Sequence, residues 1–547
     1  MTTKTKVDWK VETVNLYEEP CDCGSQVRHN NGGNYHSIAR LVTASDGEGN
    51  AAVVVENTTK AQTLGSVLRH AFPDQSWKVI TTWGYWMAWP ATGLGLDIDR
   101  ALPKLAVKDR RSLNKILTAS READRVYLAH APSPPGELAA HFLKRHIVGQ
   151  KPEQVVKRLR CTALSQDAIR EAVEADRDID EQLVERELSR MFLDRIVTQC
   201  LTEDFLLGRA MVPVLYYLVG RKTTGQRIIA KFRSGLSEVE FRSSLIEDPG
   251  PLLEALKGPI EFRREFDEDL SAPPPLAMST LDLLISGTAE LRFKSIEILN
   301  LARELYDQGA ITYPFEAGHG ISSTIKAKIG TRIEALAGKK LRGSYRCPDG
   351  MDPRECVRPT DISVDASSLP KTTRALYRLI WARTMAACSV PARVRHERIT
   401  MEIEGVTFEA SGLQVTKSGY DRVGLGMLLR SQEIPEDIMF TGARVESGWP
   451  REVEFLREIP WISSPTLVIN ALDNNDYIRF DGPCVVPTDY GRSMLDEVKK
   501  IAPELCSKAF LAETEYRLDQ IAAGGFERTG TLREYARWAG YRRTRIL

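Results

Sequence analysis

The sequence predicts a multidomain protein that combines an α/β domain, helical domains and a β-rich domain. Two strand–turn–helix units lie within residues 51–146, and charged helical patterns dominate residues 150–209 and the part beyond residue 489. Between them, two β-rich blocks flank a mostly helical stretch. The 547 residues are enough for several domains of ordinary size.

The bulk composition is that of an ordinary globular protein, with 42% hydrophobic and 27% charged residues. The 74 basic and 74 acidic residues balance, which excludes a globally basic, histone-like binder but allows a local basic groove. The nine cysteines are scattered and the amino terminus lacks a secretory pattern, so we expect reduced thiols in a cytoplasm. No apolar run is long enough to cross a bilayer, so no membrane association is expected.

Residues 1–49 are polar and rich in turn-forming residues, and we interpret them as an extension. Cys21, Cys23, His29 and His36 are its candidate zinc ligands. The Cys-x-Cys spacing is tighter than in usual structural zinc sites, and no second cysteine pair follows. We therefore expect no zinc.

Glu56 ends a short apolar, β-branched run that starts at Ala51 and is typical of a buried parallel strand. The polar residues 57–60 then open a helix. A strand, a polar turn and a helix amino terminus together form an anion site. In this setting, Glu56 is a candidate metal ligand and Lys60 a candidate phosphate ligand.

A second unit of the same kind runs from a strand at 124–129 through a proline-rich turn into a helix at 138–146. The two units predict a small α/β domain over residues 50–150, with its ligand edge at the carboxyl ends of the strands.

The remaining chain divides into helical and β-rich parts. We assign residues 151–209 and 456–547 to one helical domain, 210–272 and 398–455 to a β-rich domain with turns at Gly405 and Gly412, and 273–397 to an inserted helical domain. In the first of these, Arg190 and Asp194 lie four apart on one helix, a spacing that allows an ion pair. The alternative is an exposed pair of little energetic consequence.

Tyr313 is the candidate chemical centre of the insert. A helical run at 295–306 ends at Gly309, and Tyr313 follows directly before Pro314. A helix stopped by glycine and followed by a short extended segment can hold one side chain rigidly at a surface. Tyr313 is therefore a candidate nucleophile, although a half-buried strand position is the commoner explanation for a lone tyrosine.

These and further motifs, in their order along the chain, resemble the type IA DNA topoisomerases. The matching stretches are 53–64, 82–84, 93–99, 177–180, 190–195, 208–209, 279–281, 305–314, 354–360, 375–381, 486–491 and 510–522. Each motif alone is weak, but their shared order argues against chance similarity. The resemblance implies a toroid-like fold with an amino-terminal Toprim α/β domain, helical gate domains, a β-rich arch and a helical tyrosine domain.

The resemblance also implies a chemistry, in which Tyr313 attacks a single-strand phosphodiester and keeps the 5′-phosphate. It implies Lys60, Glu56 and Arg354 as catalytic partners and single-stranded DNA as the ligand. The residues that it places near the DNA are Arg190, Asp194, Arg195, Arg209, Glu355, Arg358 and Thr360. Because a phenol has a pKa near ~10, only about one in a thousand is ionised at neutral pH, and attack needs cations nearby.

The sequence departs from the family pattern at the metal site. The family's Asp-x-Asp-x-Glu cluster is matched here by Ala131, Ser133 and Pro135, so all three carboxylates are absent. Glu56 and Glu137 remain and can help to hold Mg²⁺, but the cluster that would fix its geometry is missing. The resemblance thus implies Mg²⁺, whereas the residues argue against it.

The tyrosine segment departs from the family pattern as well. Where the family has an arginine two residues after the tyrosine, this chain has Phe315, and Glu316 follows. Losing one preorganised donor typically costs about 100- to 1,000-fold in rate. The carboxylate of Glu316 would in addition repel a phosphate.

Three hypotheses for the function remain open. The missing groups favour a type IA topoisomerase-like protein that binds single-stranded DNA but is impaired in catalysis. The retained Tyr313 favours an active topoisomerase that relaxes or decatenates DNA with a rearranged metal site. The balanced charge favours a non-catalytic protein-interaction scaffold. We further expect a monomer in the cytoplasm, associated with the nucleoid.

Overall fold

A computed structural model of the chain describes residues 42–43, 50–82, 86–90, 93–200, 207–221, 225–235, 237–345, 347–349, 351, 354–423 and 434–538. The predicted extension, with Cys21, Cys23, His29 and His36, lies outside the described residues except for 42–43. The chain divides into two compact units. The first unit comprises Met1–Ala91 and Lys104–Val184, and the second comprises Thr92–Pro103 and Glu185–Leu547.

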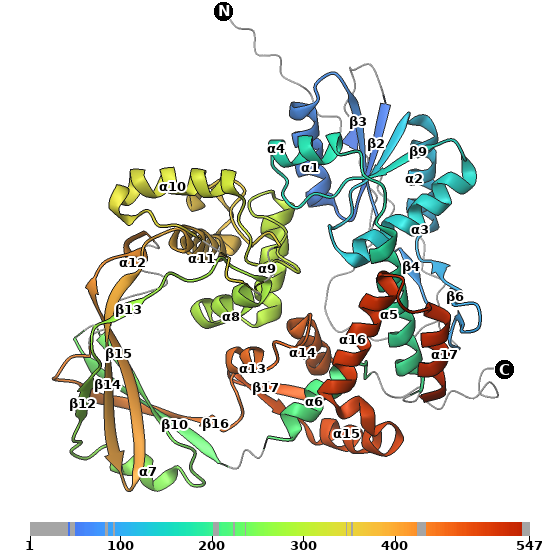
Figure 1. The fold of residues 1–547 in the computed structure, drawn as a ribbon. Coiled ribbons are helices and arrows are strands. Elements are labelled where there is room, and N and C mark those ends of the chain that lie inside the picture. Colours follow the sequence, from blue (N-terminus) through green and yellow to red (C-terminus); the bar gives the residue numbers. More distant parts are fainter. Residues whose placement is uncertain are drawn as a thin grey trace, which may run out of the picture. The chain divides into compact units, whose positions relative to one another are not determined.

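The first unit is built on a mostly parallel sheet in the order β1-β3-β2-β8-β9 (Figure 1). Its strands are β1 (Val42–Thr43), β2 (Asn50–Val55), β3 (Ser76–Thr81), β8 (Arg125–Leu128) and β9 (Val155–Arg158). Only β1 pairs antiparallel, with β3. β2 is buried from Ala51 to Val55, as expected for a central parallel strand covered on both faces.

Helices cover both faces of this sheet. α1 (Thr58–Ala71) packs with α4 (Gln166–Glu174) on one face, and α2 (Arg110–Glu122) packs with α3 (Pro134–Gln150) on the other (Figure 1). The short strand β4 (Met87–Ala88) pairs with β7 (Ala106–Val107). The structure differs from the prediction at β9, because the sequence predicts helix from residue 150. A four-residue strand ending in Lys157 and Arg158 is too short to show the alternation of apolar and polar residues that indicates a strand.

The second unit contains an antiparallel sheet in the order β12-β14-β15-β11-β10-β16, with β13 also paired to β14 (Figure 1). The strands are β10 (Gln226–Ser234), β11 (Ser237–Ser243), β12 (Arg263–Phe266), β13 (Leu270–Ala272), β14 (Ala392–Ile403), β15 (Val406–Lys417) and β16 (Met439–Ser447). Phe232, Phe241 and Phe408 form its core with residues of α7 (Gly250–Ala255).

Of the two turns predicted in this sheet, one is confirmed and one is wrong. Gly405 has a φ of 74° and joins β14 to β15. Gly412 instead lies inside β15, where it pairs with Glu397 of β14. A glycine within a long antiparallel ladder weakens the strand but does not end it.

Helices make up the rest of the second unit (Figure 1). Between β13 and β14 the chain forms α8 (Thr280–Leu291), α9 (Ser295–Asp307), α10 (Ser323–Ala337) and α11 (Lys371–Ala387). The other helices are α5 (Glu181–Cys200), α6 (Met211–Val219), α12 (Tyr420–Val423), α13 (Glu452–Glu458), α14 (Pro465–Asn474), α15 (Asp489–Ile501), α16 (Lys508–Ala522) and α17 (Arg528–Trp538). The second unit also contains two short antiparallel strand pairs. β5 (Leu96–Asp97) pairs with β6 (Leu102–Pro103), and β17 (Ile478–Asp481) pairs with β18 (Cys484–Pro487).

The predicted mixture of α/β, helical and β-rich parts is confirmed. The finer division into an amino-terminal extension and four domains stays a prediction. Among the described residues, no helix combines the length and the apolar character that crossing a membrane requires.

Candidate active site

Glu56 and Lys60 form an ion pair at the carboxyl end of β2. Asn57 caps α1 by accepting a hydrogen bond from the backbone N–H of Lys60. One turn into the helix, Lys60 Nζ lies 3.0 and 3.1 Å from the two carboxylate oxygens of Glu56. Although burial opposes ionisation, Lys60 holds the pKa of Glu56 below its ordinary value. The pair is therefore charged, and the buried ammonium of Lys60 is engaged rather than presented to a ligand.

Glu137 and Arg158 form a second ion pair at the same edge of the sheet. Arg158 ends β9 and donates its Nε to Glu137 Oε1 at 3.0 Å, and both side chains are 0% exposed. The other guanidinium nitrogens donate to the backbone carbonyls of Leu128, Leu159 and Ala131. The second oxygen of Glu137 accepts from the backbone N–H of Asp180 at 3.3 Å. A buried pair needs such additional hydrogen bonds to offset its desolvation.

The turn that joins β8 to α3 is closed by backbone and hydroxyl groups. Ser133 caps α3, with its Oγ 3.4 Å from the N–H of Gly136, and Pro134 and Pro135 begin the helix. A Cβ on Gly136 would lie 2.0 Å from the carbonyl oxygen of Ala131, so only glycine fits there. His130 beside the turn is buried, and burial lowers its pKa to about 4. Its imidazole is therefore neutral at pH 7.

Tyr313 follows α9 in the second unit, in a segment whose geometry the sequence predicts. The helix ends at Asp307, and Gly309 has a φ of 77° at the left-handed position that commonly ends a helix. The ring of Tyr313 contacts Tyr306 edge-on at 5.2 Å and Phe315 at 5.3 Å between centroids. Two aromatic neighbours therefore fix the position of the phenol.

Hydrogen bonds hold this segment from two sides. On one side, the N–H of Thr312 donates to the carbonyl of Arg358 at 2.9 Å, and the N–H of Thr360 donates to the carbonyl of Ala310 at 3.0 Å. On the other side, Thr280 Oγ accepts from the N–H of Ala317 and donates to the carbonyl of Pro314, both at 2.8 Å. These contacts fix the backbone around Tyr313 by main-chain groups and the hydroxyl of Thr280. The replaced side chains Phe315 and Glu316 take no part in them.

Two cations lie near the tyrosine segment. Arg354 is 58% exposed, and its Nη1 lies 3.7 Å from Glu316 Oε2. The sequence prediction missed Arg303 on α9, whose Cζ lies 4.9 Å from the ring centroid of Phe315. Burial raises the pKa of Glu316, and Arg354 opposes this shift. A phosphate at this segment would meet two arginines and one carboxylate.

The residues predicted near the DNA fall into two networks within the second unit. Around α5, Arg190 pairs with Asp194 at 2.7 Å, and the buried Arg209 bridges Asp194 at 3.1 Å and Glu515 at 2.8 Å. Beside Tyr313, Glu355 accepts from Arg358 at 2.7 Å, and Thr360 Oγ donates to the carbonyl of Gly309 at 2.6 Å. Arg195 donates to the carbonyls of Leu94 and Gly93.

These networks engage most of the predicted DNA-binding cations. Arg209 and Arg358 are 4% and 8% exposed, so they support the fold rather than offer charge to a ligand. Arg190 keeps 38% of its side chain exposed. Arg354, with 58% of its side chain exposed, therefore offers a more accessible charge than Arg190, which pairs with both Glu187 and Asp194. Their role at DNA stays a prediction.

Comparisons with known proteins show similarity to DNA topoisomerases. The sequence model of a family described as DNA topoisomerase matches residues 252–444, which include Tyr313. DNA topoisomerase 1 of Aquifex aeolicus (strain VF5) is 25% identical over 521 residues, which cover 86% of this chain and 95% of that protein. DNA topoisomerase 1 of Campylobacter jejuni is 24% identical over 553 residues, with 88% and 77% covered. Over most of its length, the chain is thus similar to proteins of the type IA DNA topoisomerase family.

The fold of the family is also found among solved structures. Full-length topoisomerase I from Thermotoga maritima matches with a TM-score of 0.65 at 21% identity, covering 89% of each chain. The predicted type IA topoisomerase fold class is thereby confirmed.

The residues of this chain do not fit the Mg²⁺ site that the resemblance to type IA topoisomerases implies. Ala131, Ser133 and Pro135 offer no carboxylate, and Glu56 and Glu137 are already paired with buried cations. Within the described residues, no group of three or more His, Cys, Asp or Glu side chains is placed to hold a metal ion. We therefore assign no step to a metal.

Sequence reasoning missed Arg158 and Arg303, and each had a weak signal. Arg158 follows an apolar pair in a position where a further parallel strand could end, but the strand itself was not predicted. Arg303 lies three residues before Tyr306 on the same helix face, one turn from the end of α9. Only the packing of Phe315 identifies it as a neighbour of Tyr313.

Proposed function

We propose that this chain binds single-stranded DNA as a type IA topoisomerase-like protein, with Tyr313 at the position of the nucleophile and with impaired catalysis. The proposal rests on one observation at the carboxyl ends of the strands in the first unit. There, Glu56 forms an ion pair with Lys60, and Glu137 forms one with Arg158. Carboxylates in such pairs have little left to offer Mg²⁺. The curated relatives are named DNA topoisomerase 1, which supports DNA as the ligand.

The proposed attack is limited by the charge around Tyr313. In the family reaction, the tyrosine loses its phenolic proton and its oxygen bonds to phosphorus, while the bond from phosphorus to the 3′ oxygen breaks and that oxygen takes up a proton. The reverse reaction rejoins the strand. Since a phenol is rarely ionised at neutral pH, nearby cations must stabilise both the phenolate and the phosphate. Arg354 and Arg303 are the candidates on the described side chains, and Glu316 opposes them. This balance supports slow cleavage.

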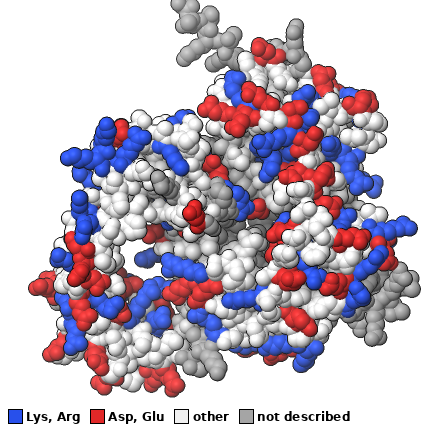
Figure 2. Space-filling view, viewed as in Figure 1, with Lys and Arg blue, Asp and Glu red and all other residues white. Residues whose placement is uncertain are grey.

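The proposed DNA contact is local rather than a property of the whole surface. Figure 2 shows Lys and Arg interspersed with Asp and Glu over much of the visible face, with a basic cluster over α10. The formal net charge is zero. We propose a monomer that contacts a single strand through exposed side chains such as Arg190 and Arg354, in the cytoplasm and at the nucleoid.

The decisive experiment measures binding, cleavage and relaxation side by side. The protein, Tyr313→Phe and the control Tyr516→Phe are incubated with supercoiled plasmid and with a single-stranded oligonucleotide labelled at its 3′ end, with and without Mg²⁺. We expect binding in low salt by all three, little or no covalent adduct, and no relaxation. Tyr516 lies exposed on α16 and reports any general effect of losing a hydroxyl.

The same experiment tests the alternatives. The second candidate is an active topoisomerase, which the backbone support of Tyr313 favours. It requires an adduct and relaxation that vanish in Tyr313→Phe and persist in Tyr516→Phe. An absence of binding even at low salt would contradict both DNA-binding proposals and leave the protein-interaction scaffold.

A further inference from the structure

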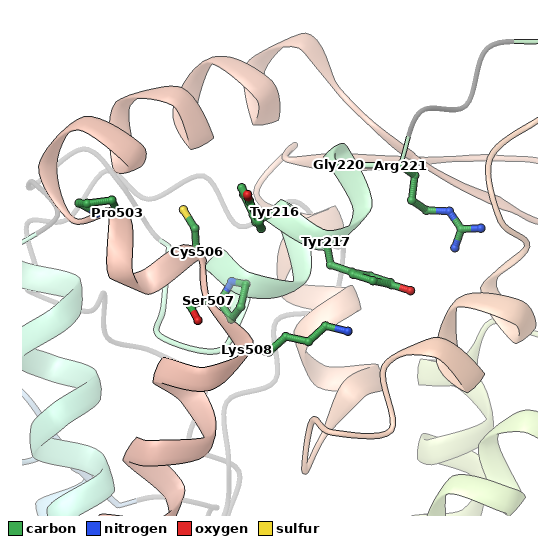
Figure 3. A pocket seen from close by; sticks show the side chains of 9 residues that line it. Tyr216, Tyr217, Gly220, Arg221, Pro503, Cys506, Ser507 and Lys508 are labelled. Carbon is green, nitrogen blue, oxygen red and sulfur yellow. The ribbon is translucent and has the colours of Figure 1, made fainter.

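The second unit contains an open pocket between the end of α6 and the start of α16 that the proposed chemistry does not use. Figure 3 shows its lining, and the cavity measures about 630 Å³. Arg221 and Lys508 are among the lining residues, which include no carboxylate. The volume falls in the ~300–1,000 Å³ range of small-ligand sites.

The pocket has an aromatic wall because of how α6 presents two successive tyrosines. α6 is apolar on nearly every side, and its neighbours Tyr216 and Tyr217 point about 100° apart around the helix. Tyr217 stacks on Phe455 at 6.4 Å and meets Trp461 edge-on at 6.3 Å. Tyr216 is 43% exposed, so part of its ring faces solvent, and the ammonium of Lys499 lies 5.6 Å from the centroid of this ring.

The charge of Lys508 is held at this aromatic wall. Its Nζ lies 4.1 Å from the ring centroid of Tyr217 and 4.7 Å from that of Trp461. Over the described part of the chain, no carboxylate lies within ion-pair distance of Lys508. Arg221, in contrast, pairs with Glu458. Lys508 therefore offers an available positive charge beside an exposed ring.

We propose that this pocket binds an unpaired nucleotide of a single DNA strand, whose base stacks on Tyr216 and whose phosphate meets Lys508. Stacking on aromatic side chains is how proteins bind unpaired bases without reading sequence, and it contributes about 1–3 kcal/mol per base. An anionic ligand with a flat face uses both the ring and the ammonium, whereas an acidic peptide uses only the ammonium. This inference rests on the proposed binding of single-stranded DNA and adds a second contact to it.

The test compares matched variants in a DNA-binding titration. Full-length Tyr216→Leu, Tyr216→Phe and Lys508→Gln are titrated against fluorescein-labelled oligothymidylate, beside Tyr516→Leu and Lys500→Gln as controls. Tyr516 is 54% exposed, and Lys500 is exposed on α15. We expect Tyr216→Leu to weaken binding about 5- to 100-fold, Tyr216→Phe to bind as the unchanged protein does, and both controls to have no effect.

The salt dependence isolates the phosphate contact. Lys508→Gln should weaken binding and reduce the slope of log K against log salt concentration by about 0.7, the value for one phosphate of a single strand. Circular dichroism confirms that each variant is folded. Photocrosslinking of 4-thiothymidine in the oligonucleotide should label the peptide that carries Tyr216 or that carrying Lys508.

Each failure has its own signature. If the unchanged protein binds no oligonucleotide in low salt, the proposed function is overturned and this inference with it. If it binds but Tyr216→Leu and Lys508→Gln bind equally well, only the nucleotide pocket is overturned. If Lys508→Gln abolishes binding of a polyglutamate peptide but leaves oligothymidylate binding unchanged, the pocket belongs to an acidic protein segment instead.

Discussion

The ligand edge of the first unit and the tyrosine segment of the second unit have both lost residues of the family pattern, with different physical results. At the ligand edge, buried basic side chains occupy the candidate metal ligands, because Lys60 pairs with Glu56 and Arg158 pairs with Glu137. At the tyrosine segment, the backbone support is complete and the surface is altered, with Phe315 and Glu316 beside Tyr313. A metal site depends on side-chain oxygens and is lost with them, whereas a position held by main-chain hydrogen bonds survives substitution.

The largest expected effect would come from breaking the buried ion pair between Arg158 and Glu137 at the ligand edge of the first unit. Arg158→Met removes the buried partner of Glu137 and leaves this buried carboxylate only the longer contact with Arg160 Nε at 3.5 Å, so we expect the first unit to lose up to about 3–5 kcal/mol of unfolding free energy. Urea unfolding followed by the fluorescence of Trp77 would measure the loss. The double variant Arg158→Met/Glu137→Leu is the control, and it should recover most of the stability. A loss below about 1 kcal/mol in the single variant would contradict a structural ion pair.

Restoring charge at the tyrosine segment should give the next largest effect. Phe315→Arg places a guanidinium two residues after Tyr313, where the family has one, so we expect adduct formation to rise by about 100-fold or more. The amount of 3′-labelled oligonucleotide retained on denatured protein measures the rate. Phe315→Leu is the matched control for loss of the ring that holds Arg303. An unchanged rate would place the limiting loss at the first unit instead.

Ser133 caps α3 and stands where the family pattern has one of its metal-binding carboxylates. Substituting it tests what the serine contributes in that place. Ser133→Ala removes the hydroxyl that bonds to Gly136 N–H, so we expect a loss of about 1 kcal/mol in the stability of the first unit. Ser133→Asp keeps a capping oxygen and should keep the stability. We also expect Mg²⁺ to leave its thermal midpoint unchanged, because Glu56 and Glu137 remain paired. A clear Mg²⁺-dependent rise would show that one restored carboxylate reopens the site.

The smallest expected effect concerns Glu316. Burial raises its pKa above the ordinary value against the opposing charge of Arg354. As pH falls from neutral toward this raised pKa, the carboxyl gains a proton and its repulsion of phosphate disappears. DNA binding should therefore strengthen by less than about 1 kcal/mol on acidification. Glu316→Gln should bind more tightly at neutral pH and lose this dependence, and identical pH profiles would contradict the assignment.

The sequence was sufficient wherever local patterning determines the structure. The buried run 51–55, the stop at Gly309 and the extended segment before Pro314 follow from strand burial, glycine geometry and the restriction before proline. The alternation of α/β, β-rich and helical parts follows from the same patterns. The motif order then indicated the family.

Long-range pairing limited the prediction of the site. Arg158 and Glu137 are 21 residues apart, and Arg209 and Glu515 are 306 apart, so no local pattern shows that these charges neutralise each other. The sequence therefore assigned Arg209 and Arg358 to the DNA, whereas the structure buries both. Sequence pattern reports which charges exist, and only the fold shows which of them remain accessible.

The antiparallel pairing of β13 with β14 has a further consequence for the helical insert. Ala272, the last residue of β13, pairs with Ala392, the first residue of β14, so the structure ends the insert at residue 391 rather than at the predicted 397. The chain thus leaves the sheet and returns at points about 5 Å apart. Such a segment is an insertion between two paired strands. A tight turn could replace it without altering the register of the strands. The part that carries Tyr313 is thereby joined to the sheet at one place along the chain, where Ala386 of α11 packs with Ala392 and Tyr420.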